Sequence, residues 1–464
     1  MNWFSRWITG RRLAVPAPRP KLARASERSY ADTLGRYAIF QQTVRNYPDG
    51  AEIYYKRAIE ADPRHTRNLC NYAGFLQGVR HDLDGAERYL KRAIEADPNY
   101  GVALGRYASF LDTVRNDPDA AETYYKRAIG VDHVDPGSLG SYAVFLATIR
   151  HDEDEAETYY RLAIDADPSD VRNLGNYATF LAFVRTDPDA AEIYFRRTLD
   201  ADPGYAINLG NYALFLSYVR PDPDRAEIYY KRAIEADPKD ASYVGAYATF
   251  LNNVRHDPDK SQTCFKRAVE VDPVNAVTLG AYAYFLDNVR HNADSAETYY
   301  MRAIEADPRS SDNLGRYAIF LQTIRHDPDQ AETFYRGAID TDMSDRVFVG
   351  NLAGILLSKG ATAEGLRLLT RARELSSRPD LAVELAFYEY AHDPDPGRRQ
   401  SGLTRVKLLL REGVRSPGWP MGHNVERARQ DGHPEPEFLG RLSAVIIDAS
   451  DISELDKFDC WKDA

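Results

Sequence analysis

Histidine side chains recur at one position of this chain and could do chemistry there. Each follows an arginine, and they are separated by multiples of 35 residues: His81, His151, His256, His291 and His326. A row of imidazoles could hold metal ions or respond to pH. Equivalent helices in a stack lie about 10 Å apart, which is too far for neighbouring histidines to share one ion at zinc-ligand distances. Because Asn46, Asn116 and Thr186 take the same position in other copies, we interpret the histidines as exposed residues at a helix end.

The arginine before this position is more constant than the histidine. It is present in nine copies: Arg45, Arg80, Arg115, Arg150, Arg185, Arg220, Arg255, Arg290 and Arg325. Such a row could bind RNA phosphates. Each arginine also falls at the C-terminal end of a predicted helix, where the helix dipole favours a cation, and beside an acidic turn such as Asp187-Pro188-Asp189. We therefore interpret the row as structural neutralisation of acidic turns.

Signatures of catalysis are missing from the sequence. It contains no phosphate loop, G-x-S-x-G, H-E-x-x-H or C-x-x-C motif. Cys70, Cys264 and Cys460 are odd in number and scattered, as incidental thiols of a reducing compartment are. We expect a non-enzymatic cytoplasmic protein with no cofactor and no metal. The alternative is an enzyme whose site lies in the C-terminal region.

The charge of the chain restricts its partners. The net charge is −11, although residues 1–30 carry seven Lys or Arg and only one Glu. An acidic body argues against a dedicated nucleic-acid binder, whose domain is usually basic. No run of 18 apolar residues is present that would span a membrane. We therefore expect protein partners and no nucleic acid.

The elements that must position these side chains follow from a strict period. A repeated phrase opens at every 35th residue: Leu34, Leu69, Leu104, Leu139, Leu174, Leu209, Val244, Leu279, Leu314 and Val349. A fixed period of this length is typical of a solenoid. In the copy that opens at Leu174, Tyr177, Ala178 and Leu181 fall at i+3, i+4 and i+7, the stripe of a helix buried on one side.

A second helix follows in each copy. Its predicted inner face carries Ala191, Tyr194, Phe195 and Thr198 in the Leu174 copy. The pairs from Asp49/Glu52 to Asp329/Glu332, including Asp189/Glu192, predict a capping box at its start. One such hairpin cannot bury its own apolar face, but a stack can. The sequence predicts an all-α, right-handed superhelical solenoid of stacked helix-turn-helix repeats.

The second helix resembles the tetratricopeptide repeat (TPR) family. The spacings of Ala191, Phe195, Thr198 (alanine in most copies) and Pro203 match that family. The family period is 34, and we place the extra residue of this chain in the turn between Thr186 and Asp189. The stretch L-x-x-Y-A-x-F is also similar to half-a-TPR (HAT) repeats. The resemblance implies a scaffold that binds a peptide or helix of a partner protein. The alternative is an RNA-processing-associated scaffold of HAT type.

In TPR proteins the first helices line a concave groove, and the resemblance places a peptide-binding groove on these helices. The position before Tyr-Ala varies between copies, and an asparagine there would hold a peptide backbone. Arginines one turn earlier would pair with acidic side chains, and exposed aromatic residues would give apolar contacts. The predicted groove residues are Arg36, Arg67, Asn71, Arg106, Arg172, Asn176, Phe183, Asn211, Tyr218, Tyr284 and Arg316. The lysine of chaperone-binding members is replaced by Gly175 and Gly210, so their carboxylate clamp is not expected.

The expected organisation has three parts. Residues 1–29 form a basic N-terminal arm, residues 30–378 form the solenoid of about ten repeats, and residues 379–464 form a helical cap. If residues 2–12 are helical, Trp3, Phe4, Trp7 and Ile8 form one apolar stripe. This stripe could contact an anionic membrane surface, dock on a partner, or fold back onto the chain itself.

Overall fold

The computed structural model describes residues 21–131, 135–375 and 378–462. These residues contain helices and no strand. The chain forms two compact units, residues 1–222 and 223–464. The division falls inside the sixth copy of the period, between its first and second helices. The expected three-part organisation stays a prediction, and the apolar stripe expected at Trp3 to Ile8 lies outside the described residues.

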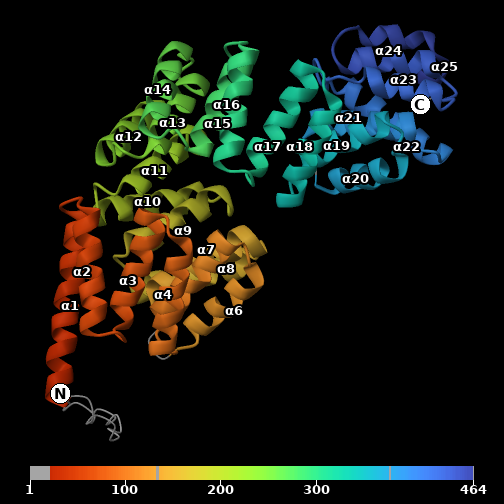
Figure 1. The fold of residues 1–464 in the computed structure, drawn as a ribbon. Helices are drawn as coiled ribbons and strands as arrows, with labels where there is room; N and C mark the ends of the chain where they lie inside the picture. The colour runs from red at the N-terminus through yellow and green to blue at the C-terminus, as the bar shows by residue number, and fades with distance from the viewer. Residues whose placement is uncertain (1–20, 132–134, 376–377, 463–464) are drawn as a thin grey trace, which may run out of the picture. The chain divides into compact units, whose positions relative to one another are not determined.

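Unit 1 is a series of helical hairpins, drawn in Figure 1 from red at α1 to yellow at α11. The first helices of successive copies pack on one another, as do the two helices of each hairpin. The elements are α1 (Lys21–Thr43), α2 (Pro48–Ala61), α3 (Thr66–Phe75), η1 (Leu76–Arg80), α4 (Leu83–Ala96), α5 (Gly101–Phe110), η2 (Leu111–Arg115), α6 (Pro118–Ile129), α7 (Pro136–Phe145), η3 (Leu146–Arg150), α8 (Glu153–Ala166), α9 (Val171–Phe183), α10 (Pro188–Ala201) and α11 (Ala206–Tyr218).

Unit 2 continues the same hairpins and ends in helices that have lost the period. Its repeat elements are α12 (Pro223–Ala236), α13 (Ala241–Asn253), α14 (Pro258–Val271), α15 (Ala276–Asn288), α16 (Ala293–Ala306), α17 (Ser311–Phe320), η4 (Leu321–Arg325), α18 (Pro328–Thr341), α19 (Arg346–Ser358) and α20 (Thr362–Leu375). The remaining elements are α21 (Pro379–His392), α22 (Pro396–Arg411), α23 (Gly422–Gln430), α24 (Pro436–Ile446), η5 (Ile452–Lys457) and α25 (Asp459–Lys462).

The predicted apolar stripes form the core of the repeats. In α9, Leu174, Tyr177, Ala178 and Leu181 are all buried. The ring of Phe195 on α10 is also buried, 5.3 Å from the Tyr212 ring of the next first helix. Each copy thus buries its apolar face against its own second helix and against the following copy. The predicted all-α stack of helical repeats is confirmed.

The second helices begin two residues earlier than the predicted capping box. The side chain of Asp187 accepts a hydrogen bond from the backbone N–H of Ala190 at 3.0 Å, and α10 starts at Pro188. The same cap is made by Asp82, Asp117, Asp152, Asp257, Asn292 and Asp327. The prediction that Asp189 and Glu192 form a capping box is therefore wrong. Their carboxylates remain available for other bonds.

The extra residue of the 35-residue period lies in the first helix, not in the turn after it. The last turn of this helix widens to π-type bonding, in which the Arg185 N–H bonds to the Phe180 carbonyl five residues back at 3.0 Å. In the last copy the equivalent Gly360 N–H instead bonds to the Leu357 carbonyl three residues back at 3.1 Å. That copy therefore lacks the wide turn. The extra residue is accommodated by the π-type turn.

The histidine row ends this wide turn in a left-handed backbone conformation. His81, His151, His256, His291 and His326 have φ of 51–55°, as do Asn116 and Thr186. Asn and His tolerate this region better than most side chains. The recurrence of these residue types thus follows from backbone geometry.

Two of the repeat glycines show why consecutive first helices can approach closely. A Cβ added to Gly140 would lie 1.9 Å from Oδ1 of Asn173 on the next first helix. The Asn173 amide is buried and donates to the Pro136 carbonyl at 3.0 Å. An analogous buried amide, Asn68, donates to the Ala31 carbonyl and faces Gly35. The glycine at this position is therefore required for packing, which also explains why no lysine is present there.

Helices α21 to α25 pack on the last repeats and extend the core of unit 2. The Trp419 indole N–H donates to the Tyr388 hydroxyl at 2.8 Å, and Trp461 is buried near Phe438. Burial raises the pKa of the Glu384 carboxyl to about 7, although the Ser416 hydroxyl donates to it. The C-terminal side of the last repeat is therefore covered by protein.

Candidate binding groove

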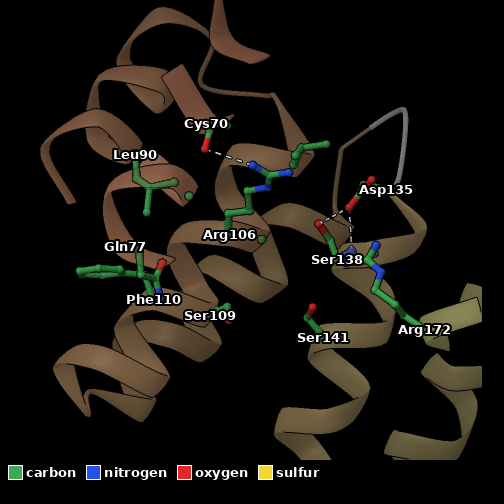
Figure 2. A pocket seen from close by; sticks show the side chains of 14 residues that line it. Cys70, Gln77, Leu90, Arg106, Ser109, Phe110, Asp135, Ser138, Ser141 and Arg172 are labelled. Atoms are coloured by element: carbon green, nitrogen blue, oxygen red, sulfur yellow. Dashed lines mark hydrogen bonds between the residues drawn. The ribbon is translucent and has the colours of Figure 1, made fainter. Parts of the chain in front are cut away.

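A hollow of about 460 Å³ opens on the first-helix face of unit 1. Four consecutive first helices, α3, α5, α7 and α9, contribute most of its lining, and Figure 2 shows their side chains. The lining residues are Cys70, Gly74, Gln77, Leu90, Val102, Gly105, Arg106, Ser109, Phe110, Asp135, Gly137, Ser138, Ser141 and Arg172. Neutral polar and charged side chains dominate this list, so the hollow can form many hydrogen bonds.

Arg106 crosses from α5 to α3 at one end of the hollow. Its Nη1 donates to the Cys70 carbonyl at 3.1 Å and to the Asn71 Oδ1 at 3.4 Å. The side chain of Arg106 remains exposed. A guanidinium carries five N–H donors, so donors remain for a ligand.

Arg172 and Asp135 lie at the other end of the hollow, beside the start of α7. Asp135 caps α7 and accepts from the Ser138 N–H at 2.8 Å and from its hydroxyl at 2.9 Å. A Cβ on Gly137 would lie 3.1 Å from Asp135 Oδ2 and 3.3 Å from Arg172 Nη2, so the glycine leaves room for both. The side chain of Arg172 is 65% exposed and lies 3.5 Å from Asp170. Its charge is thus open to solvent.

The thiol at the edge of the hollow is not activated. Cys70 is buried, and burial raises its pKa to about 11 in spite of the nearby Arg106 charge. A protonated thiol is a poor nucleophile and a poor metal ligand. Among the residues whose side chains the structure describes, no group of three His, Cys, Asp or Glu is placed to hold a metal ion. The hollow is therefore suited to binding through hydrogen bonds and charge.

The remaining predicted groove residues of unit 1 lie outside this hollow. Arg36 and Arg67 both approach Asp32, at 3.1 and 3.8 Å. The Asn211 amide donates to the Thr179 hydroxyl at 3.3 Å, whereas the Asn176 side chain makes no hydrogen bond among the described residues. Phe183 and Tyr218 are exposed, at 41% and 46%. Of the eleven predicted residues, the hollow is lined by Arg106 and Arg172.

Tyr284 and Arg316 belong to unit 2. The Arg316 guanidinium lies 4.9 Å from the centre of the Tyr284 ring and also bonds to Asp312 at 2.7 Å. The two residues come from the consecutive first helices α15 and α17. The two side chains therefore contact each other across neighbouring first helices.

The row of arginines is not part of this face. The Arg150 guanidinium bonds to Asp119 at 2.6 Å and to Glu122 at 2.7 Å, both on the second helix of the preceding copy. The same pairing joins Arg80, Arg115, Arg185, Arg220, Arg255, Arg290 and Arg325 to the copy before each of them. Structural neutralisation was the right interpretation, but the partners lie one repeat away rather than in the adjacent turn.

The glutamates that pair with the arginine row also accept hydrogen bonds from the tyrosines of the repeats. Glu52 accepts a hydrogen bond from the Tyr72 hydroxyl at 3.4 Å, and the Lys56 ammonium followed by Arg80 lowers the pKa of its carboxyl. Lys91 and Lys126 are the first causes of the lowered pKa of Glu87 and Glu122 in the same way. The recurrence of Asp, Glu and Arg at fixed positions was the signal for this row in the sequence.

Four segments of the chain, residues 67–98, 100–129, 139–168 and 205–238, match the model of the Sel1 repeat. No curated protein matches the sequence. Among solved structures, the chain is similar to yeast Tom70, with 17% identity over 92% of this chain and 98% of that chain and a TM-score of 0.44. It is also similar to YrrB, a TPR protein with an unusual peptide-binding site, with 19% identity over 42% and 97% of the two chains and a TM-score of 0.29.

Proposed function

We propose that this TPR-like repeat protein is a non-enzymatic scaffold of the cytoplasm that binds a peptide or helix of a partner protein along the first helices of unit 1. The observation that carries the proposal is the polar hollow between α3 and α9. Its position on four consecutive first helices suits an elongated ligand that crosses several repeats. The three cysteines are free, which fits a reducing compartment.

The charges of the hollow favour a partner segment with acidic side chains. The carboxylates of the second helices are engaged with arginines of the next copy, whereas Arg106 and Arg172 keep exposed guanidinium groups at the two ends of the hollow. Arginine binds carboxylates with paired hydrogen bonds. Outside the hollow, on the same first helix as Arg172, Asn176 carries an amide that makes no hydrogen bond among the described residues and could donate to and accept from a peptide backbone.

The test compares the proteins captured by the full chain and by groove variants. We expect Arg106→Glu combined with Arg172→Glu to lower recovery of a direct partner about tenfold or more, because two attractive charges become repulsive. Asn176→Ala with Asn211→Ala should weaken the same partner. Quantitative mass spectrometry after affinity purification measures both effects.

The matched control is Arg88→Glu, which changes an exposed arginine on α4 outside the hollow. It should leave recovery unchanged, and circular dichroism should show all variants folded. If the groove variants recover the same proteins in the same amounts as the unmodified chain, partners do not bind in this hollow and the proposal fails.

The RNA-scaffold alternative has less support. Its motivating observations were the half-a-TPR likeness and the arginine row, and eight of the nine arginines of that row are paired with carboxylates of the preceding copy. Filter binding of a single-stranded RNA at two salt concentrations separates the alternatives, because phosphate contacts predict a steep loss of affinity with salt. We expect no such binding.

A further inference from the structure

The N-terminal face of the stack carries the same residues as an internal interface between repeats but meets no repeat among the described residues. We define this face by Tyr37, Phe40 and Arg45, at the end of the first helix of the first copy. These residues are equivalent to those that contact the preceding repeat everywhere else in unit 1. In the first copy no described repeat precedes them, because α1 is the first described helix.

Three kinds of contact in the internal interface join a second helix to the next copy. In the second copy, Arg80 bonds to Asp49 at 2.6 Å and to Glu52 at 2.8 Å. The Tyr72 hydroxyl donates to Glu52, and the Phe75 ring lies 5.4 Å from a tyrosine ring of the same second helix. That second helix thus presents Asp, Glu and Tyr at spacings of three residues.

The N-terminal face carries the tyrosine, phenylalanine and arginine of these contacts, but no acidic second helix faces them among the described residues. Tyr37 is 36% exposed and Phe40 is 39% exposed, whereas the equivalent Tyr72 and Phe75 are 3% and 1% exposed. The Arg45 guanidinium lies 5.5 Å from the centre of the Phe40 ring and forms no ion pair among the described residues. Terminal repeats of solenoids normally carry a polar outer face, so two exposed aromatic rings and a cation here indicate a binding surface.

We propose that the N-terminal face binds a helix of a partner protein that carries an acidic residue, a glutamate three residues later and an aromatic residue three residues after that. The carboxylates would bond to Arg45 and the Tyr37 hydroxyl, and the aromatic ring would pack on Phe40. The charge of the face and the repeated internal contact both select this chemistry. The site is separate from the groove of unit 1.

Two other occupants fit the face less well. A second copy of this chain would have to offer the same acidic pattern, but in the described repeats those carboxylates already bond to the following copy. Residues 1–20 contain Trp3, Phe4 and Trp7 but no Asp or Glu. They could not supply the carboxylates that Arg45 lacks.

The test uses a lactam-bridged helical peptide with the sequence of residues 48–62 of this chain and measures its binding to the full chain by fluorescence anisotropy. The bridge offsets the poor helicity of short peptides. We expect saturable binding that Arg45→Glu weakens about tenfold through charge repulsion. A peptide carrying Asp49→Lys and Glu52→Lys should recover affinity for the Arg45→Glu variant.

Matched variants keep the result specific. Arg88→Glu reverses an exposed charge elsewhere in unit 1 and should leave binding unchanged, as should Arg106→Glu with Arg172→Glu in the groove. Phe40→Ala should weaken binding without unfolding the chain, which circular dichroism would check. The groove variants test the proposed function and the face variants test the N-terminal face, so one proposal can fail while the other holds.

Three outcomes would overturn the proposal. The binding curve could fail to saturate. Alternatively, Arg45→Glu could leave the affinity unchanged, and the charge-swapped peptide could bind the Arg45→Glu variant no more tightly than the original peptide does. Sedimentation could reveal a dimer of this chain that Arg45→Glu dissociates, which would make a second copy the occupant. Binding only after removal of residues 1–20 would assign the face to that segment.

Discussion

At the scale of residues, the ion pairs between repeats are the most regular feature of the molecule. Seven arginines of the row join two carboxylates that lie 28 and 31 residues earlier in the chain, as for Arg150 with Glu122 and Asp119. Arg290 joins only Asp259, because Gln262 replaces the glutamate in that copy. Side chains of Asp119 and its equivalents are highly exposed, whereas the glutamates and arginines are partly buried. The glutamate therefore contributes more to stability than the aspartate, because exposed pairs are screened by solvent.

Removing one arginine of the row tests this contribution. We expect Arg150→Ala to lower the free energy of unfolding by about 1 kcal/mol, because the Glu122 carboxylate loses a partly buried partner. Thermal unfolding followed by circular dichroism measures the change. The control is Arg45→Ala, which removes the equivalent arginine where no carboxylate faces it. Equal losses for both variants would show that the pairs between repeats contribute nothing measurable.

At the scale of elements, the position of one cap decides the role of the acidic residues that follow. Because Asp117 caps α6, Asp119 lies inside the first turn, and its carboxylate can reach Arg150 of the next copy. The π-type turn also affects these ion pairs. It adds one residue to the end of the first helix, before the residue with positive φ, and the arginine at the end of this turn still reaches the carboxylates of the preceding copy. In the last copy, Lys359 makes the equivalent pair with Glu332 at 2.8 Å without the wide turn.

Alanine substitutions at the two aspartates distinguish the two assignments of the cap. Asp117→Ala should cost about 1 kcal/mol, because the Ala120 N–H loses its bond at 3.0 Å. Asp119→Ala should cost only a few tenths of a kcal/mol, because its pair with Arg150 is exposed. Thermal unfolding midpoints of both variants give the comparison. A larger loss for Asp119→Ala would restore the original capping-box assignment.

At the scale of the whole molecule, each unit is held together by contacts between neighbouring hairpins. Stability in such arrays is roughly a sum of repeat and interface contributions. The row of ion pairs between repeats is present in both units. A change of pH therefore acts on all of these interfaces between repeats at once. Among the described helices, none combines the length and apolar composition that a membrane span requires.

Acid should therefore destabilise the repeats of both units together. The Lys56 ammonium and Arg80 hold the pKa of Glu52 below its ordinary value of 4.5, and Glu87, Glu122 and Glu227 are lowered likewise. The folded state binds fewer protons than the unfolded state in this range, so the stabilisation is present above pH 4.5 and is lost as pH falls through the lowered pKa values. Unfolding midpoints measured from pH 6 down to pH 3 should fall progressively.

The control for the acid effect is a variant in which Glu122→Gln removes one titrating group. Its unfolding midpoint should be lower than that of the unmodified chain at pH 6, and the difference should shrink toward pH 3. A difference that does not depend on pH would mean that this carboxyl makes no charge-dependent contribution to folding.

The sequence by itself determined the helices, their pairing and the buried stripes. The periods of 3.6 and 35 residues are spacings along the chain, so they can be read without knowing which repeats contact each other in space. The match of Leu174, Tyr177, Ala178 and Leu181 to the core follows directly from this spacing. The half-a-TPR character and the groove residues stay predictions, since the repeat pattern places these residues on a face without saying what they bind.

Only the tertiary structure decided which carboxylate each arginine meets, where each second helix begins and which first-helix residues surround a hollow. In the sequence Asp187 and Asp189 are equally plausible caps, and only the hydrogen bond of 3.0 Å from the Ala190 N–H to the Asp187 carboxylate separates them. Arg106 and Asn71 are 35 residues apart, and their contact depends on how closely two first helices approach. Such relations are set by packing between repeats, which no local pattern contains.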